Sequence, residues 1–301
     1  MTYQIALGEN LSHELVAIVD DQAGKARNAL LGGIADRDEA IHEARKRFKK
    51  LRGLYRLVRP AAPDLYATEN ARLRDSAHAL SVVRDAAALV ETLDRLRADP
   101  LSQSVRDDLD RVRETLARRR DAIADDGGQL DPAIAEAVES CEATMKAARQ
   151  VRLPSGKKAA AQCLSAGMGK TFKRARKAFG AARESGKPED WHELRKRMKY
   201  HHMHCRLLRQ AWPAMMMMRS TQAKAIADLL GDDHDLAVLE GLVRVEPDAV
   251  GDADARESLI HVMHLSSERL RAAAVERAAL VLSDKPATVE DAVAALCRQA
   301  A

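Results

Sequence analysis

Residues 42–59 read HEARKRFKKLRGLYRLVR, and residues 192–209 read HELRKRMKYHHMHCRLLR. Aligned without a gap at an offset of 150 residues (192 − 42), the two stretches share nine identical residues: His, Glu, Arg, Lys, Arg, Lys, Arg, Leu and Arg. In both stretches basic and apolar residues recur at helical spacing. Each stretch therefore predicts one amphipathic helix with a basic face beside an apolar face.

The same offset recurs outside these two helices. It aligns four further positions with identical residues: Leu80, Asp85, Ala87 and Leu89 with Leu230, Asp235, Ala237 and Leu239. One register that runs through most of a chain indicates an internal duplication. We therefore predict two versions of one helical unit, residues 1–150 and residues 151–301, which together form one domain.

The composition favours an all-α fold. Apolar residues make up 46% of the 301 residues, which is enough for a substantial core, but aromatic residues only 3%. Alanine and long unbranched side chains favour helices, and strand-forming residues are scarce. Short loops predict an antiparallel helical bundle in each half. The helices expected are 10–31, 36–59, 64–98 with a bend near 81–84, two more before residue 150, and then 157–184, 188–210, 213–230, 233–245, 252–283 and 288–300.

Localisation signals are missing from the sequence. The first residues, MTYQIALGENLSHEL, lack the charged and apolar regions of a secretion signal, and no stretch has the roughly 18 apolar residues of a membrane span. The four cysteines are far apart and form no CxxC pair. We therefore expect reduced thiols, a cytoplasmic location and no membrane partner.

Each basic helix carries its cationic side chains on one narrow face. At 100° per residue, five positions of the first helix fall within a wedge of about 80°, over a length of roughly 21 Å. We call these two rows the basic stripes. The first contains His42, Arg45, Lys49, Arg52 and Arg56, and the second His192, Arg195, Lys199, His202 and Arg206.

A run of charge is often only a solvated helix face, but here an anionic ligand is the better interpretation. Like charges three or four residues apart repel one another, and Glu43 is the only acid among residues 42–59, against eight lysines and arginines. The stripes also border the apolar faces, and the arrangement occurs twice. Further candidate binding residues are Lys46, Lys196, Lys173, Arg176 and Lys177.

These residues resemble the CHAD family, the conserved-histidine α-helical domains. The resemblance rests on a His-x-x-Arg-x-x-x-Lys/Arg-x-x-Arg helix in each half, and on LLGDDHDLAVL at 229–239 with its degraded counterpart LSVVRDAAAL at 80–89. It covers essentially the whole chain. It implies two pseudo-symmetric bundles whose basic helices line a shared groove or pore.

The resemblance also implies binding of inorganic polyphosphate, often at polyphosphate granules. We expect binding without catalysis and no cofactor. Asp85 and Asp235 are expected to orient basic side chains without contacting the ligand themselves. His202 departs from the family pattern, which has arginine at this position. We expect the second stripe to be weaker and sensitive to pH, because histidine titrates near neutrality.

Two other functions use the same residues. Nucleic acid would be attracted by the same charges, but the chain has few aromatic residues for stacking. A metal-dependent phosphohydrolase could use His234 and Asp235. The offset aligns His234 with Arg84, however, and arginine is not a metal ligand. The alternative for this segment is a helix start capped by Asp232 or Asp233.

Overall fold

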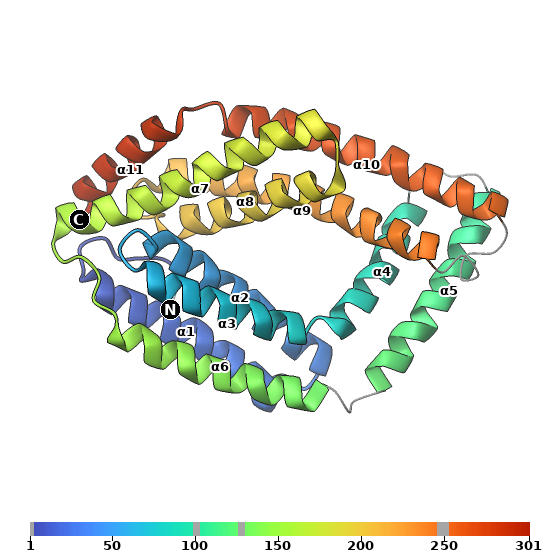
Figure 1. Ribbon diagram of the computed structural model, residues 1–301, viewed down its shortest axis with the longest axis horizontal. Coiled ribbons are helices and arrows are strands. Elements are labelled where there is room, and N and C mark those ends of the chain that lie inside the picture. Colours follow the sequence, from blue (N-terminus) through green and yellow to red (C-terminus); the bar gives the residue numbers. More distant parts are fainter. Residues whose placement is uncertain (1–2, 99–102, 126–129, 246–252) are drawn as a thin grey trace.

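The computed structural model describes residues 3–98, 103–125, 130–245 and 253–301, and the regular structure in these ranges is entirely helical (Figure 1). This confirms the all-α class. In chain order the helices are α1 (Leu11–Asn28), a π-helical turn (Ala29–Gly33), α2 (Arg37–Val58), α3 (Pro63–Ala79), α4 (Val82–Arg97), α5 (Gln103–Asp125), α6 (Leu130–Gln150), α7 (Lys157–Ser185), α8 (Pro188–Leu207), α9 (Pro213–Val245), α10 (Ala253–Val281) and α11 (Pro286–Ala300).

Local sequence signals set most helix ends. The side chain of Asn10 accepts hydrogen bonds from the backbone of the first turn of α1, and Asp36 accepts one from the Glu39 amide at the start of α2. Asp36 is therefore the N-cap of α2, and Asp38 lies within its first turn. α2 ends at Val58, just before Pro60, because proline cannot continue the helical hydrogen bonds.

The predicted break between residues 230 and 233 is wrong. α9 runs without interruption through this segment, so no free helix start exists for Asp232 or Asp233 to cap. Asp233 is instead buried (2% exposed) and accepts a hydrogen bond from Arg271 Nε at 2.8 Å and one from Ser267 Oγ on α10. This contact with α10 holds the continuous helix in place. The aligned segment of the first half is interrupted at Leu80–Ser81, between α3 and α4.

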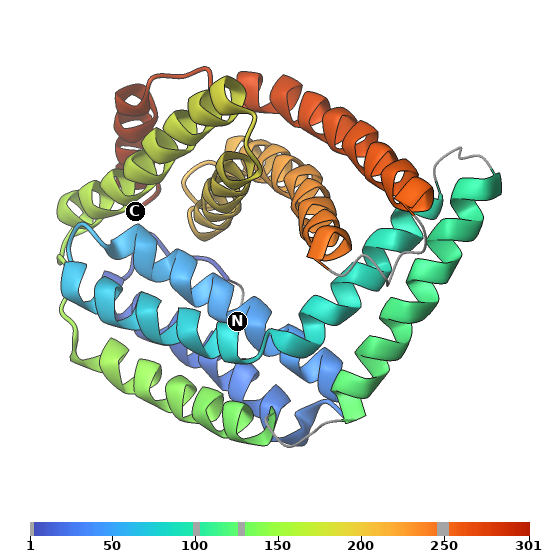
Figure 2. The same ribbon diagram turned by 45° about the vertical axis from the view of Figure 1, so that its right-hand side comes forward.

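Two apolar clusters form the core, and neither is confined to one half of the sequence. The larger cluster joins α1, α2, α3 and α6 to α7, α8, α11 and the first half of α9. The smaller one joins α4 and α5 to the end of α9 and the start of α10, through side chains such as Leu93, Leu109, Leu239 and Met263. α4 and α5 extend away from the other helices of the first half towards α9 and α10 (Figure 2). The expectation of a separate bundle for each half therefore does not describe the core.

α2 packs against several helices, and α8 is one of them. The neutral ring of His204 on α8 donates from Nε2 to the carbonyl oxygen of Gly53, at 3.1 Å, where the two helices cross. On another side the Tyr55 hydroxyl is hydrogen-bonded to the Thr144 hydroxyl of α6, at 2.8 Å. The two basic helices are consequently neighbours in space.

No helix among the described residues is long and apolar enough to cross a bilayer. All four cysteines are buried and free. Burial raises the pKa of the Cys163 thiol to about 11, so this thiol is protonated at neutral pH.

The contact between α2 and α7 depends on Gly167. A Cβ atom at this position would lie 1.8 Å from the carbonyl oxygen of Leu57, so the two backbones could not approach as they do. The AGMGK segment around Gly167 thus belongs to the middle of α7, where its glycine allows close helix packing.

We expect Gly167→Ala to lower the free energy of unfolding by at least about 2 kcal/mol, because the added methyl group has no space. Gly180→Ala is the matched control. It lies in the same helix with no atom within 4 Å of the added Cβ, and should raise stability by up to about 1 kcal/mol. Chemical denaturation followed by circular dichroism measures both. Equal effects of the two substitutions would contradict the packing argument.

Candidate functional site

A cavity of about 1020 Å³ lies between α2, α4, α8 and α9. Among the described residues its wall contains eight lysines and arginines but two aspartates. α2 contributes His42, Arg45, Lys46, Lys49 and Lys50; α8 contributes Arg195, Lys199, His202, Met203 and Arg206; α9 contributes Lys224, Ala227, Asp228, His234, Asp235 and Val238; and α4 contributes Ala88 and Leu89. We call this space the central cavity.

The central cavity brings together residues from both predicted stripes. From the first it takes His42, Arg45 and Lys49, and from the second Arg195, Lys199, His202 and Arg206, with Lys46 beside them. Residues more than 140 positions apart in the chain thus line one space.

The far end of the first stripe lies elsewhere. Arg52 donates from Nε to the side chain of Asn70 at 3.1 Å, and Arg56 is buried between the rings of Tyr66 and Tyr200. The helical-wheel prediction put both arginines with the rest of the stripe. α2 crosses α8 at Gly53, however, so the residues close to and beyond the crossing face different neighbours from those before it.

Other predicted binding residues also lie outside the central cavity. The ring of His192 stacks against that of His234, with 4.0 Å between centroids, while Lys196 pairs with Glu193. On α7, Arg176 donates to the carbonyl oxygen of Asp284. Lys173 and Lys177 of the same helix are exposed.

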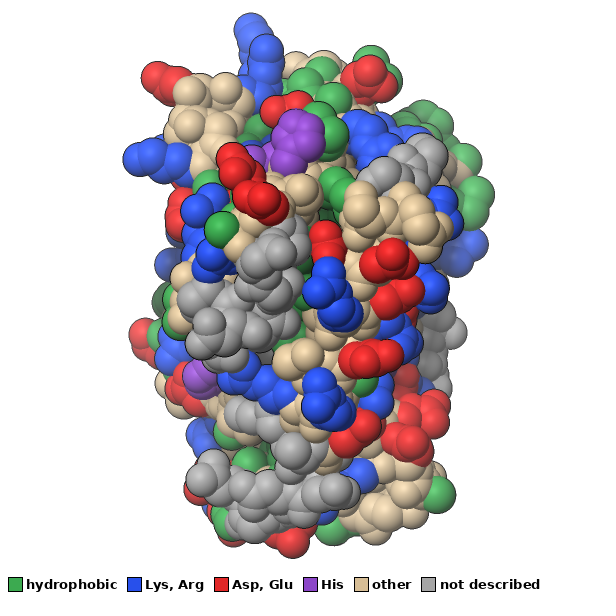
Figure 3. Space-filling model, turned by 90° about the vertical axis from the view of Figure 1, so that its right-hand side faces the viewer, with side chains coloured by type: hydrophobic (Ala, Val, Ile, Leu, Met, Phe, Trp, Pro, Cys, Tyr) green, Lys and Arg blue, Asp and Glu red, His purple; other side chains and the backbone are tan. Residues whose placement is uncertain are grey.

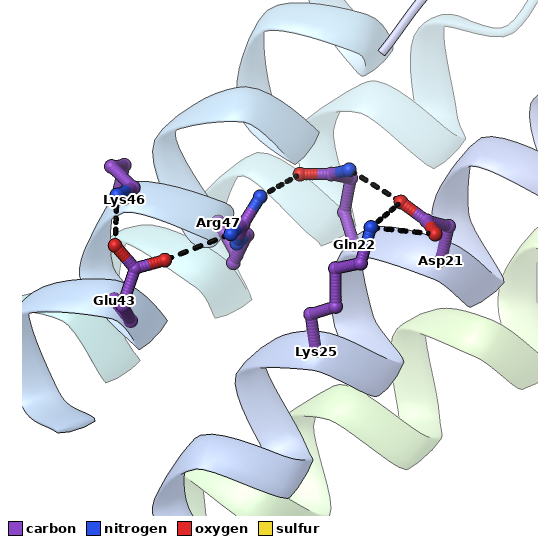
Figure 4. Close-up of polar contacts among 6 residues, drawn as sticks. All are labelled: Asp21, Gln22, Lys25, Glu43, Lys46 and Arg47. Atoms are coloured by element: carbon purple, nitrogen blue, oxygen red, sulfur yellow. Dashed lines mark hydrogen bonds and ion pairs between the residues drawn. The ribbon is translucent and has the colours of Figure 1, made fainter. Parts of the chain in front are cut away.

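Each basic helix contains one acid that pairs with two cations at the same spacing. On α2, Glu43 forms ion pairs with Lys46 and Arg47. Arg47 also donates a hydrogen bond to Gln22 on α1, and Gln22 and Lys25 both donate to Asp21 (Figure 4). On α8, Glu193 binds Lys196 and Arg197 in the same way. The acids of both helices therefore neutralise charge beside the central cavity and leave the lysines and arginines farther along its wall to dominate.

Arg195 and Lys199 are partly buried in the cavity wall. No described residue accepts a hydrogen bond from the buried Nε of Arg195, and none pairs with the Lys199 ammonium. Burial, and then the charges of Arg195 and Lys49, lower the pKa of Lys199 to about 7. Such groups are stabilised by an anion, because a buried charge without a partner is unfavourable.

Arg195 lies against α9 at Gly231. A Cβ at residue 231 would be 3.2 Å from the Arg195 Nη2 atom, so the missing side chain gives the guanidinium its place. This explains the Leu-Gly start of the segment at 229–239 in physical terms. With an alanine at 231, the guanidinium of Arg195 would have to shift by a few tenths of an ångström.

Asp235 lines the central cavity and also contacts Arg95 of α4, at 3.3 Å, while Asp232 approaches the same arginine at 3.5 Å. The carboxylate thus lies in the cavity wall itself and pairs with Arg95, which was not among the predicted residues. The side chain of Asp85 lies outside the described part of the structure.

Sequence reasoning missed Lys50, Lys224 and Asp228. Lys224 and Asp228 form an ion pair one turn apart on α9 and both line the cavity. Nothing in the local sequence of α9 distinguishes them from an ordinary surface pair, because only the position of α9 relative to α2 brings them to this wall.

The histidines do not form a metal site with the acids in the described ranges. No group of three or more His, Cys, Asp or Glu side chains there is arranged to hold a metal ion. His201 and His204 are fully buried, whereas His202 faces the cavity and is hydrogen-bonded to the Ser220 carbonyl oxygen at 3.0 Å. The three residues therefore point to different surroundings.

The outer surface contrasts with the cavity wall. On the face at the end formed by α4, α5 and α10, lysine and arginine are interspersed with aspartate and glutamate (Figure 3). Interspersed charges of both signs are typical of a solvated surface. The cavity wall differs from this face in its excess of lysine and arginine over acids.

Comparisons with known proteins identify the fold. A family model described as the CHAD domain matches residues 17–244. Among solved structures, the chain is similar to PptA from Streptomyces chartreusis, with 15% sequence identity and a TM-score of 0.58; the match covers 90% of this chain and 99% of that one. At this identity the likeness concerns the fold alone. No curated protein sequence matches the chain.

The lowered pKa of Lys199 predicts proton uptake when an anion binds. At pH 8 Lys199 is mostly neutral, and an anion in the cavity would raise its pKa and favour its charged form. We expect uptake of about one proton at pH 8, and an affinity that rises as the pH falls from 9 to 6. Calorimetry in buffers with different ionisation enthalpies measures the uptake. In Lys199→Arg, whose guanidinium stays charged, only the smaller uptake due to Lys50 should remain; unchanged uptake would contradict the assignment.

Proposed function

Because the chain belongs to the CHAD family, we propose that its central cavity binds inorganic polyphosphate without changing it chemically. The family is linked to polyphosphate binding. The observation that carries the proposal is the cavity wall itself, which joins cations of α2 and α8 that are far apart in the sequence. Binding of this kind would associate the protein with polyphosphate granules.

The chemistry of the wall suits phosphate. Arginine offers a planar set of N–H donors to phosphate oxygens, and lysine supplies a compact charge. Arg45 comes from α2 and Arg195 from α8, and Lys49 and Lys199 lie one turn further along each helix. A chain of phosphates running between α2 and α8 would therefore find donors on both sides.

The two carboxylates of the wall support binding more than catalysis. Asp228 is paired with Lys224, and Asp235 with Arg95, so each is already engaged with a cation. Both stand on α9, seven residues apart, which is about two helical turns. We assign them the role of positioning cations, in place of activating water.

The wall also favours polyphosphate over nucleic acid. Its described residues include no Phe, Tyr or Trp, so the large rings on which bases usually stack are absent there and only the smaller rings of His42, His202 and His234 remain. Binding of single-stranded nucleic acid usually combines a basic groove with such stacking. Polyphosphate has no bases, so its binding does not require such stacking.

A competition experiment tests the proposed function. At one fixed salt concentration, long polyphosphate should displace a labelled polyphosphate chain far better than single-stranded RNA or duplex DNA of equal charge does. The double substitution Arg45→Glu with Arg195→Glu should weaken binding at least about 100-fold, because two charge-assisted contacts are lost. Lys158→Glu, an exposed site in the first turn of α7, is the control with a smaller charge change and should bind almost normally. Equal displacement by RNA would refute the proposal.

Affinity should also depend on chain length. If one chain contacts both helices, the second contact is intramolecular and has a high effective concentration. Affinity should climb with length until the chain spans the cavity, and then level off. Lys199→Glu should weaken long chains much more than tripolyphosphate, as measured by calorimetry over a length series. Equal losses at all lengths would show that the two helices act independently.

A further inference from the structure

A second group of cations lies outside the central cavity, where the end of α2 meets α3, α7 and α8. We call it the arginine–tyrosine cluster, defined as Arg56, Arg59, Lys170 and Arg174 with the rings of Tyr66 and Tyr200. The guanidinium carbon of Arg56 lies 4.0 Å from the centroid of the Tyr200 ring and 5.1 Å from that of Tyr66. Arg59 lies over the same Tyr66 ring, at 4.6 Å.

Arg56 is a buried charge without a counterion. It is 9% exposed, and no described residue accepts a hydrogen bond from its Nε atom. The faces of the two tyrosines compensate part of the lost hydration through cation–π attraction. This attraction does not replace a hydrogen bond, and the Nε–H group of Arg56 has no acceptor among the described residues. Buried polar groups of this kind normally have a partner.

The rim of the cluster is equally short of acids. No described carboxylate lies within ion-pair distance of Arg59, Lys170 or Arg174. Although Lys170 is exposed, the charge of Arg59 lowers its pKa, and the pKa of Arg174 is lowered by burial and then by Arg197, Arg59 and Arg56. Arg197 itself is paired with Glu193. The rim cations therefore repel one another and would be stabilised by a bound anion.

The cluster and the central cavity lie on different sides of α8. At 100° per residue, Tyr200 of the cluster points about 140° away from Arg195 and about 100° away from Lys199, which both line the cavity. Arg56 and Arg59 belong to the repeated pattern, because the 150-residue offset aligns them with Arg206 and Arg209, but the cations of α7 and the ring of Tyr66 do not. The 150-residue offset aligns Lys170 with Asp20, Arg174 with Gly24 and Tyr66 with Met216. The helical framework alone does not account for these cations.

We propose that the arginine–tyrosine cluster is a second, separate phosphate-binding site. Arg59, Lys170 and Arg174 would bind a phosphate group beside Arg56. Arg56 and Arg59 lie over the tyrosine rings, and a phosphate oxygen could accept the hydrogen bond for which the Nε–H group of Arg56 has no described partner. The phosphate can come from a free short phosphate or from the end of a polyphosphate chain. The site does not depend on the function proposed for the central cavity.

Tripolyphosphate is the probe that tests this site, with calorimetry at a low, fixed salt concentration. We expect two equivalents to bind to the unchanged protein, one to Arg174→Glu and one to Lys199→Glu, and no tight binding to the double variant. Lys170→Glu, at an exposed position that folding does not need, should also lose one equivalent or weaken it at least tenfold. Lys158→Glu, on the same helix, should retain both.

The outcomes separate the two sites. Two equivalents in both Arg174→Glu and Lys170→Glu would overturn the second site, as would an equal loss in Lys158→Glu. If Lys199→Glu keeps two equivalents while Arg174→Glu keeps one, the second site stands and the function of the central cavity fails. Tripolyphosphate that still binds one equivalent in the presence of saturating long chains identifies a site for free short phosphates. Exclusion of that equivalent, together with weaker binding of long chains by Arg174→Glu, identifies a site for part of the chain.

Discussion

The contact of α2 with α8 is the constraint on which the rest of the molecule depends. Two helices that each carry an excess of positive charge cross at Gly53, where a hydrogen bond from His204 joins them. α7 supports this pair from the other side, and its close approach is possible because Gly167 has no side chain. Apolar burial must hold the two helices together, because their charges oppose the contact. The large core cluster, which includes Phe48 and Met198, supplies that burial.

The cations gathered in the cavity wall lower the stability of the unliganded protein and favour the binding of an anion. The pKa of Lys199 falls to about 7 because the ammonium group is removed from water and because the cavity wall already holds Arg195 and Lys49. A ligand that binds only the folded state shifts the equilibrium towards that state, and by more as its concentration exceeds the dissociation constant. An anion in the cavity would therefore both bind and stabilise. An anion would stabilise Arg56 for the same reason, because this arginine is buried against two tyrosines and its Nε atom has no hydrogen-bond partner among the described residues.

The acids of the protein are placed according to this requirement. Glu43 and Glu193 neutralise cations at the same positions on α2 and α8, and Asp235 holds Arg95 between α4 and α9. Asp233, which the sequence suggested as a helix cap, instead fastens α9 to α10 through Arg271. Acids are thus used to fix helices and to orient side chains, while the wall between the basic helices remains rich in cations.

The sequence by itself determined the helical class, most helix ends and the two basic helices. These features depend on local periodicity and on caps such as Asp36, which act over a few residues. The tertiary structure decided which cations meet. A helical wheel treats the row from His42 to Arg56 as one surface, but the crossing with α8 separates its ends. Lys224 and Asp228 joined the wall through the position of α9, and the division of the core between two clusters followed from α4 and α5 packing on α9 and α10. These outcomes depend on contacts between residues far apart in the chain, which local patterns do not contain.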